Sequence, residues 1–191
     1  MRASRLLDRV PLRWWFIGTI GLLLAGSAAF GGLADAETAD VGPVAVEPGE
    51  EFVGPELAVV VDSAEFSDTA PGRYEPDEGY TYLVVRATVT NLWTVSSITF
   101  TDLLQIPEFG EDLAKAERVT FSDGTLGPQI NPQVPVDVVF MWDFPSSLIP
   151  EDGVVPVTIM SKSFTEDGDV TYGSYWSDPQ PAAIVTLETT R

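Results

Sequence analysis

The residue types in this chain limit the catalytic chemistry that it can perform. Its 191 residues include no histidine and no cysteine, and histidine is the commonest general base, proton shuttle and metal ligand. A serine nucleophile would therefore need a lysine as its base. The only obvious pairing is Ser161-Lys162-Ser163, where neighbouring side chains of a strand point to opposite faces. We therefore expect no serine hydrolase, and the sequence assigns no catalytic residue.

Carboxylates offer a second route to catalysis. Two carboxylates at the right separation suffice for glycoside hydrolysis, and the chain carries 29 Asp and Glu residues. With so many acids, chance pairs are unavoidable, and no spacing singles out two of them. We therefore expect a protein that is not an enzyme.

Calcium is the cofactor that the acidic loops would favour, because hard cations take oxygen ligands. The densest acidic cluster is the turn at residues 166–169, and a looser group lies at residues 62–68. Neither has the spacing of an EF-hand loop, and acidic turns are ordinarily just solvated. We expect no bound cofactor; if calcium binds, its candidate ligands are Glu166, Asp167 and Asp169.

Large aromatic residues gather in two places. Tyr172, Tyr175 and Trp176 lie close together near the C-terminus, and Trp93 lies in a predicted turn. Exposed flat rings can stack on sugars or anchor a protein partner. Filling the core or a strand corner is the commoner use of such rings in a β-sandwich. These four residues are candidates for recognition, whereas Trp142 lies in an apolar alternation and is assigned to the core.

The N-terminal segment predicts where these residues are displayed. Four arginines between Arg2 and Arg13 precede an apolar stretch of 21 residues, 14–34. A helix of that length spans about 30 Å, one hydrocarbon core, and basic residues concentrate on the cytoplasmic side. We predict a cytoplasmic segment at 1–13, an uncleaved signal-anchor helix at 14–34, and an extracellular remainder. The protein would then be a single-pass protein of the cell membrane.

A cleaved signal peptide is the alternative to this anchor. Its basic and apolar regions are present, and Ala34-Asp35-Ala36 offers a small-x-small cleavage site. The apolar stretch is longer than the usual signal peptide core of about 7–15 residues. A lipid-modified cysteine cannot anchor the chain, since it has no cysteine.

Small residues recur every four positions along the predicted span, at Gly21, Ala25 and Ala29. This spacing lets two helix backbones approach closely in lipid. The alternative is that glycine and alanine are simply common in an apolar helix. The expected partners are thus the lipid bilayer, through residues 14–34, and a second membrane or envelope protein.

Charge excludes nucleic acid as a partner. Residues 14–191 hold 6 basic and 28 acidic residues. Such a surface repels phosphate backbones and anionic lipids. A solvated acidic surface on an exported protein is the simplest explanation.

The region after the span divides into a linker and a domain. Residues 35–55 are rich in acids, proline and glycine, which predicts a disordered linker with an r.m.s. reach of about 25 Å. Residues 56–191 show apolar alternation with period two in short runs, typical of seven or eight strands. A helical turn is expected at 110–117. The predicted fold is an antiparallel β-sandwich, with runs at 57–61, 80–91, 98–100, 119–121, 134–142, 155–159, 170–172 and 182–187.

Two stretches carry a resemblance to a known family. The first runs from Glu75 through an acidic turn and an apolar alternation to Asn91, and the second runs from Ile130 to Pro145. Both resemble extracellular immunoglobulin-like domains of Gram-positive surface proteins and lipoproteins. The second departs from the pattern, with Asn131-Pro132-Gln133 where glycine is typical. The resemblance implies an immunoglobulin-like sandwich at the cell surface, in a group that is mostly uncharacterised and has no catalytic motif.

Together these observations favour a membrane-anchored extracytoplasmic interaction module, non-catalytic and accessory to another envelope protein. The alternative is a cell-surface module that binds wall glycan or calcium.

Overall fold

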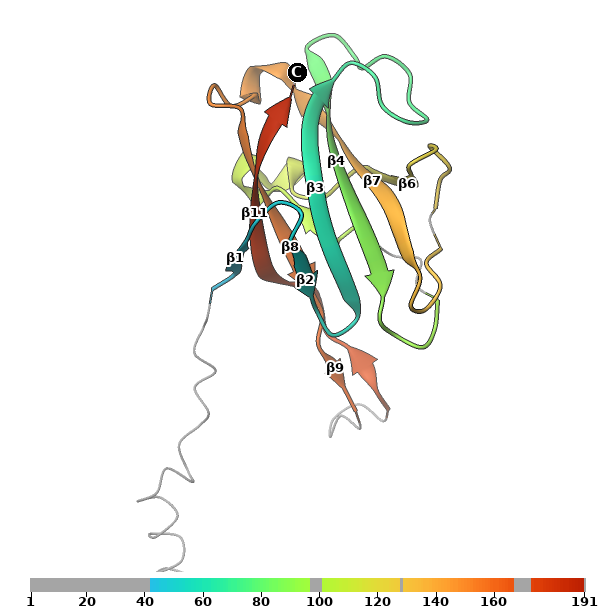
Figure 1. Cartoon of the computed structure of the whole chain (residues 1–191). Coiled ribbons are helices and arrows are strands. Elements are labelled where there is room, and N and C mark those ends of the chain that lie inside the picture. Colours follow the sequence, from blue (N-terminus) through green and yellow to red (C-terminus); the bar gives the residue numbers. More distant parts are fainter. Residues whose placement is uncertain (1–41, 97–100, 128, 167–172, 191) are drawn as a thin grey trace, which may run out of the picture. The chain divides into compact units, whose positions relative to one another are not determined.

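The computed structural model describes residues 42–96, 101–127, 129–166 and 173–190 (Figure 1). The predicted span, its small-residue stripe and the predicted strands near residues 98–100 and 170–172 therefore lie outside the described residues. Among the residues that are described, no helix is both long and apolar enough to span a bilayer. The chain is built from β-strands, with three short 3-10 helices: η2 (Pro107–Phe109), η3 (Glu111–Leu113) and η4 (Ser146–Leu148). The strands are β1 (Val44–Val46), β2 (Glu51–Val53), β3 (Leu57–Ser67), β4 (Tyr80–Asn91), β5 (Leu104–Gln105), β6 (Arg118–Phe121), β7 (Pro135–Pro145), β8 (Val154–Ser161), β9 (Phe164–Thr165), β10 (Tyr175–Trp176) and β11 (Gln180–Thr190).

The strands form two layers joined at one edge. One layer has the order β2-β3-β4-β7-β6, and the other has the order β1-β11-β8-β5. Neighbours pair antiparallel, except that β1 runs parallel to β11 and β11 pairs briefly in parallel with β3. This last pairing, at Thr189 and Thr190, closes the two layers into one curled sheet. The all-β sandwich predicted from the alternation is confirmed.

The core lies between the layers and uses the side chains that the alternation predicts. In β4 the inward residues from Leu83 to Val89 are at most 2% exposed. Trp142, assigned to the core from sequence, is fully buried beside Phe140 at a ring-centroid distance of 6.5 Å. Val134 does not share this environment, because it precedes β7 and is 47% exposed.

Strand β3 contains a β-bulge that keeps both of its halves in the core. The register with β4 shifts between Val61 and Ser63, so Asp62 is the extra residue. Before the bulge Val59 and Val61 face inward, and after it Ala64 and Phe66 do. Without the extra residue, period two would turn one half outward.

The outer face of the β3-β4-β7-β6 layer is partly covered as well. Tyr82, which alternation places on the polar face, is 3% exposed and packs with Val84, Val139 and Met141. Residues 68–79 fold back over it: the Tyr82 hydroxyl donates to the carbonyl of Tyr74 at 3.0 Å, and the Arg73 guanidinium lies 5.1 Å from the ring centre. The loop therefore supplies a second, smaller apolar cluster.

The prediction of a disordered linker is wrong for its last part. Within residues 42–55 the chain forms β1 and β2, which pair with β11 and β3. The half-buried Val46 and Phe52 pack against the core, and this contact orders a segment whose composition lacks periodicity. The tether between the predicted span and β1 is thereby shortened to residues 35–43. The helical turn expected at 110–117 occurs as η3, one 3-10 turn.

Candidate functional site

One end of the sandwich is organised around the side chain of Asn91. This residue ends β4, is fully buried, and donates from its Nδ2 to the carbonyls of Val95 (2.8 Å) and Ile130 (3.1 Å). Its Oδ1 accepts the backbone N–H of Trp93 at 2.9 Å. Each bond goes to a loop, so the side chain joins residues 92–96 to residues 129–134. We call this end the loop end; it comprises residues 53–57, 92–96, 129–134 and 162–179.

Gln133 completes the connection between these loops. Its backbone N–H donates to the Asn91 carbonyl at 2.7 Å, and its Nε2 donates to the carbonyl of Leu92. Its φ of 62° lies in the left-handed region, which favours glycine. The sequence resemblance expects glycine near this turn. Gln133 adopts the same backbone conformation, and its side-chain hydrogen bond offsets part of the strain.

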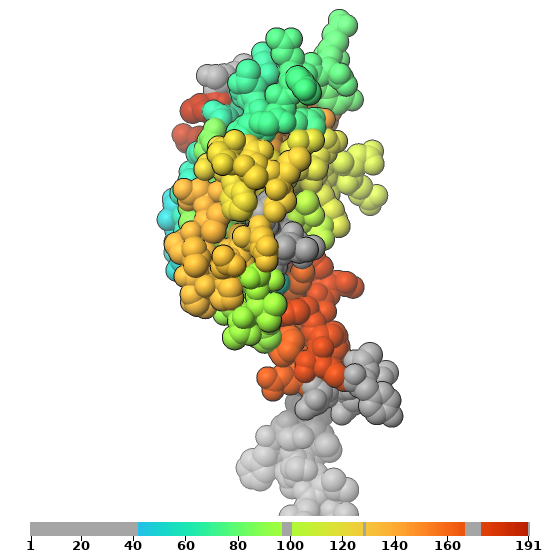
Figure 2. All heavy atoms as spheres, turned by 90° about the vertical axis from the view of Figure 1, so that its right-hand side faces the viewer, coloured from blue at the N-terminus to red at the C-terminus, as the bar shows by residue number. Residues whose placement is uncertain are grey.

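Three aromatic rings hold the β9–β10 hairpin against the 92–96 loop. The ring centre of Trp93 lies 4.7 Å from that of Phe164 and 5.0 Å from that of Trp176, and the last two rings are 5.0 Å apart. The rings are half-buried and tilted by 52–76° against one another. We call this group the aromatic brace. In Figure 2 the green 92–96 loop lies beside the orange stretch near residues 130–137 and the red-orange hairpin.

The aromatic brace is poorly suited to stacking on sugars. Stacking needs free ring faces, whereas these rings cover one another edge to face. Their mutual packing makes Trp93 and Trp176 positioning residues for the hairpin. Tyr175, next to Trp176 in β10, is 47% exposed and is the aromatic of this group best placed for contact with a partner.

Exposed valines accompany Tyr175 at the loop end. Val53, Val95 and Val134 are 62%, 65% and 47% exposed, and they come from three different loops. Because the Asn91 hydrogen bonds fix two of these loops, the apolar side chains are presented by a rigid support. Such an arrangement is typical of a protein contact surface.

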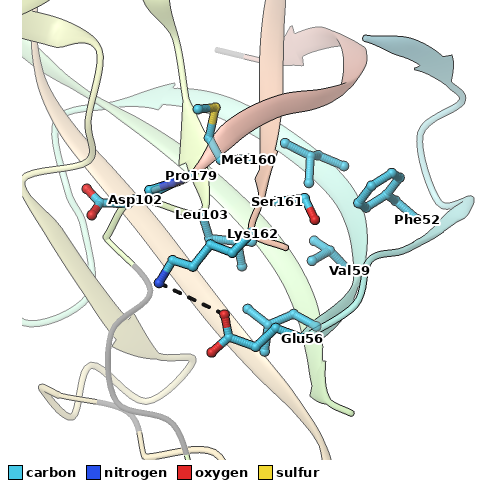
Figure 3. Close-up of a pocket in the computed structure, with 11 residues that line it drawn as sticks. Phe52, Glu56, Val59, Asp102, Leu103, Met160, Ser161, Lys162 and Pro179 are labelled. Atoms are coloured by element: carbon cyan, nitrogen blue, oxygen red, sulfur yellow. Dashed lines mark ion pairs between the residues drawn. The ribbon is translucent and has the colours of Figure 1, made fainter. Parts of the chain in front are cut away.

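A small pocket opens at the same end, between the two layers (Figure 3). The Nζ of Lys162 faces the carboxylate of Glu56 across it at 3.9 Å. Its volume is about 20 Å³, room for roughly one water molecule. The pocket is therefore a packing gap beneath the ion pair, not a ligand site; its lining also includes Phe52, Leu57, Val59, Asp102, Leu103, Ile159, Met160, Ser161 and Pro179.

The opposite end of the sandwich is acidic. The Arg73 guanidinium donates to both carboxylate oxygens of Asp143 and lies 3.9 Å from Glu117. Burial raises the pKa of Glu117, and the neighbouring Asp143 carboxylate raises it further, while Arg73 and Arg118 oppose the shift. Since 57% of the Glu117 side chain stays exposed, solvent screens these effects. This cluster fixes the 68–79 loop to the sheet.

The structure separates several residues that the sequence groups as candidates. Lys162 pairs with Glu56, in line with the expectation that it does not activate a neighbouring serine. Among the described residues, no group of three or more acidic side chains is arranged to hold a metal ion. Of the calcium candidates only Glu166 is described, and it is exposed. The remaining candidates lie outside the described residues: Asp167, Asp169, Tyr172, Gly21, Ala25 and Ala29.

Sequence reasoning missed two residues of this end. Phe164 completes the aromatic brace, and Asn91 holds the loops that carry it. Asn91 could have been found from its place at the end of the β4 alternation, where a polar residue follows an apolar one. Phe164 gives no such signal, because its partner Trp93 is distant in the sequence.

Comparisons with known proteins extend to the architecture only. No family model matches the chain, and no curated protein matches its sequence. An uncharacterised β-sandwich protein from Clostridium difficile 630 is 16% identical, with a TM-score of 0.48, over 80% of this chain and 99% of its own. A candidate lipoprotein from Bacillus subtilis strain 168 is also 16% identical, with a TM-score of 0.37, over 70% of this chain and 39% of its own. Neither likeness carries an argument about function.

Proposed function

We propose that this protein is a membrane-anchored, extracytoplasmic interaction module that binds another envelope protein through its loop end and performs no catalysis. The observation that carries the proposal is the braced presentation of Tyr175. Three mutually packed rings and one buried asparagine hold an exposed aromatic and exposed valines on loops distant in sequence. Rigid aromatic anchors on a fixed support are the features that concentrate binding energy in protein interfaces.

The strand order supports an immunoglobulin-like fold for this module. Constant-type immunoglobulin domains have the order A-B-E-D in one sheet and C-F-G in the other. With β3 as A and β4 as B, the observed order β3-β4-β7-β6 follows the first sheet, and β5-β8-β11 follows the second. The 92–96 loop then belongs to the B–C connection and the β9–β10 hairpin to the F–G connection. In antibody variable domains these two connections carry binding loops at one end of the sandwich.

Site-specific photo-crosslinking in native membranes tests the proposed contact. The full-length protein would carry p-benzoylphenylalanine in place of Tyr175, or in a second preparation in place of Val95. We expect each to give one discrete adduct with the same protein, identified by mass spectrometry. Binding of that purified protein would then be measured with wild type and with Tyr175→Ala, which should weaken affinity by about 10-fold or more if Tyr175 is an anchor.

The matched control is Tyr74, at the opposite end. It is 94% exposed, and only its backbone carbonyl is used in the fold, so its side chain can be replaced without loss of contacts. The same adduct from positions 74 and 175, or none from 175 and 95, would contradict the proposal. Retention of the protein on purified cell wall, lost in Tyr175→Ala, would establish the glycan alternative instead.

A further inference from the structure

Resting on the proposed function, we infer that the partner is an integral membrane protein lying beside the anchor, and that the loop end binds its uncharged or basic extracytoplasmic surface. The argument uses three features of the described domain: where the chain begins, how much chain precedes it, and how charge is distributed.

The described chain begins at the loop end. β1 pairs with β11 from Val44 opposite Ala183, three residues after β11 starts at Gln180. β11 then runs away from the loop end and finishes at Thr190 (Figure 1). At roughly 3.3 Å per residue, Val44 lies about 10 Å from the start of β11 and about 23 Å from its finish.

The chain before β1 is short. If residues 14–34 span the membrane, only residues 35–43 separate the bilayer from Val44. Nine residues extend to at most about 30 Å and have an r.m.s. reach of about 17 Å. That reach is shorter than the distance from Val44 to the far end of β11, so the tether favours a loop end that faces the membrane. A partner of the loop end must therefore be at the bilayer surface.

Charge selects a protein surface over the lipid itself. Residues 42–191 hold 6 basic and 25 acidic residues, which repels anionic headgroups. Within the described chain, the opposite end carries a dense set of carboxylates in residues 68–79, 108–117 and 151–152, while the valines at 53, 95 and 134 make the loop end more apolar. An uncharged or basic protein surface satisfies both the apolar contact and the surrounding negative field.

A spacer series tests this inference in membranes. Flexible Gly-Ser spacers of 10, 20 and 40 residues would be inserted between Val41 and Gly42 in the full chain that carries the crosslinker at position 175. If the partner lies beside the anchor, tethering raises the effective concentration, which falls as about the −3/2 power of linker length. We expect the adduct yield to fall steadily, about 10-fold with the longest spacer. The same spacers after Arg191 should leave the yield unchanged.

The outcomes separate this inference from the proposed function. An adduct whose yield is independent of spacer length would overturn the membrane-adjacent partner and leave the interaction module intact. Absence of any adduct in the parent protein would overturn both. In vesicles of phosphatidylcholine and phosphatidylglycerol that contain only this protein, a lipid adduct at position 175 would make the bilayer the occupant and overturn the inference.

Discussion

Among single residues, Asn91 has the largest influence on the candidate site. It satisfies two carbonyls and one N–H from three loop residues while being fully buried. A buried group left without its partner costs about 1–3 kcal/mol. The loops at this end therefore depend on one side chain for their polar contacts.

We predict that Asn91→Ala lowers the free energy of unfolding by about 2–4 kcal/mol, because three backbone groups lose their partner. Urea unfolding of the protein would measure the change. Asn131→Ala is the control: Asn131 is exposed and makes one side-chain bond, to Ser96, so its loss should stay within about 0.5 kcal/mol. Equal effects of the two substitutions would remove Asn91 from its central role.

Glu117 gives stability a dependence on pH. Its pKa is raised in the folded state by burial and by Asp143, so the folded protein holds this proton more tightly than the unfolded chain does. Its contribution is fully present below the unfolded pKa and is lost as pH rises through the folded pKa. Glu117→Gln should therefore raise the melting temperature at pH 7 slightly and have little effect well below the unfolded pKa.

Asp123 supplies the opposite sign. The backbone N–H of Thr125 bonds its carboxylate at 2.9 Å and lowers its pKa, with a further contribution from the Thr125 side chain. Its stabilisation is present above the unfolded pKa and is lost as pH falls through the folded pKa. Asp123→Asn should lower the melting temperature at pH 7. Thermal melts of both variants between pH 3 and pH 8 would check the two signs; shifts in the same direction at pH 7 would refute the assignment.

At the scale of elements, the β9–β10 hairpin is held by the aromatic brace, which lies outside the main core. The hairpin strands pair over only two residues each, and an isolated two-stranded hairpin is at best marginally stable in water. The order of the hairpin should therefore depend on ring packing more than on its own hydrogen bonds.

We predict that Trp93→Ala removes hydrogen-exchange protection from residues 163–166 and 173–177 and leaves β4 and β7 protected. The global loss should be about 1–2 kcal/mol, the value of a half-buried aromatic contact. Phe140→Ala in the core should instead cost about 3–5 kcal/mol and reduce protection everywhere. Uniform loss of protection in Trp93→Ala would show that the brace belongs to the global core.

At the scale of the whole molecule, negative charge opposes the compact state. The chain carries a net charge of −19, and the described ion pairs use each of the basic residues Arg73, Arg86, Lys115 and Lys162 once or twice. The remaining carboxylates repel one another.

Salt should therefore stabilise the protein. Raising NaCl from 0.01 M to 1 M shortens the Debye length from about 30 Å to about 3 Å. We expect the melting temperature to rise by about 2–4 °C, which corresponds to roughly 1 kcal/mol for a domain of this size. Sodium chloride and choline chloride should act alike if screening is the cause; a fall in melting temperature would show that the surface ion pairs outweigh the repulsion.

The sequence by itself determined the β-sandwich, its inward faces and the burial of Trp142, because alternation with period two is a property of each strand alone. Only the tertiary structure decided that 42–55 is ordered, that Tyr82 is buried, and that Trp93, Phe164 and Trp176 meet. These contacts join segments that are distant along the chain. Their existence depends on strand order and on the bulge in β3, which local periodicity does not encode.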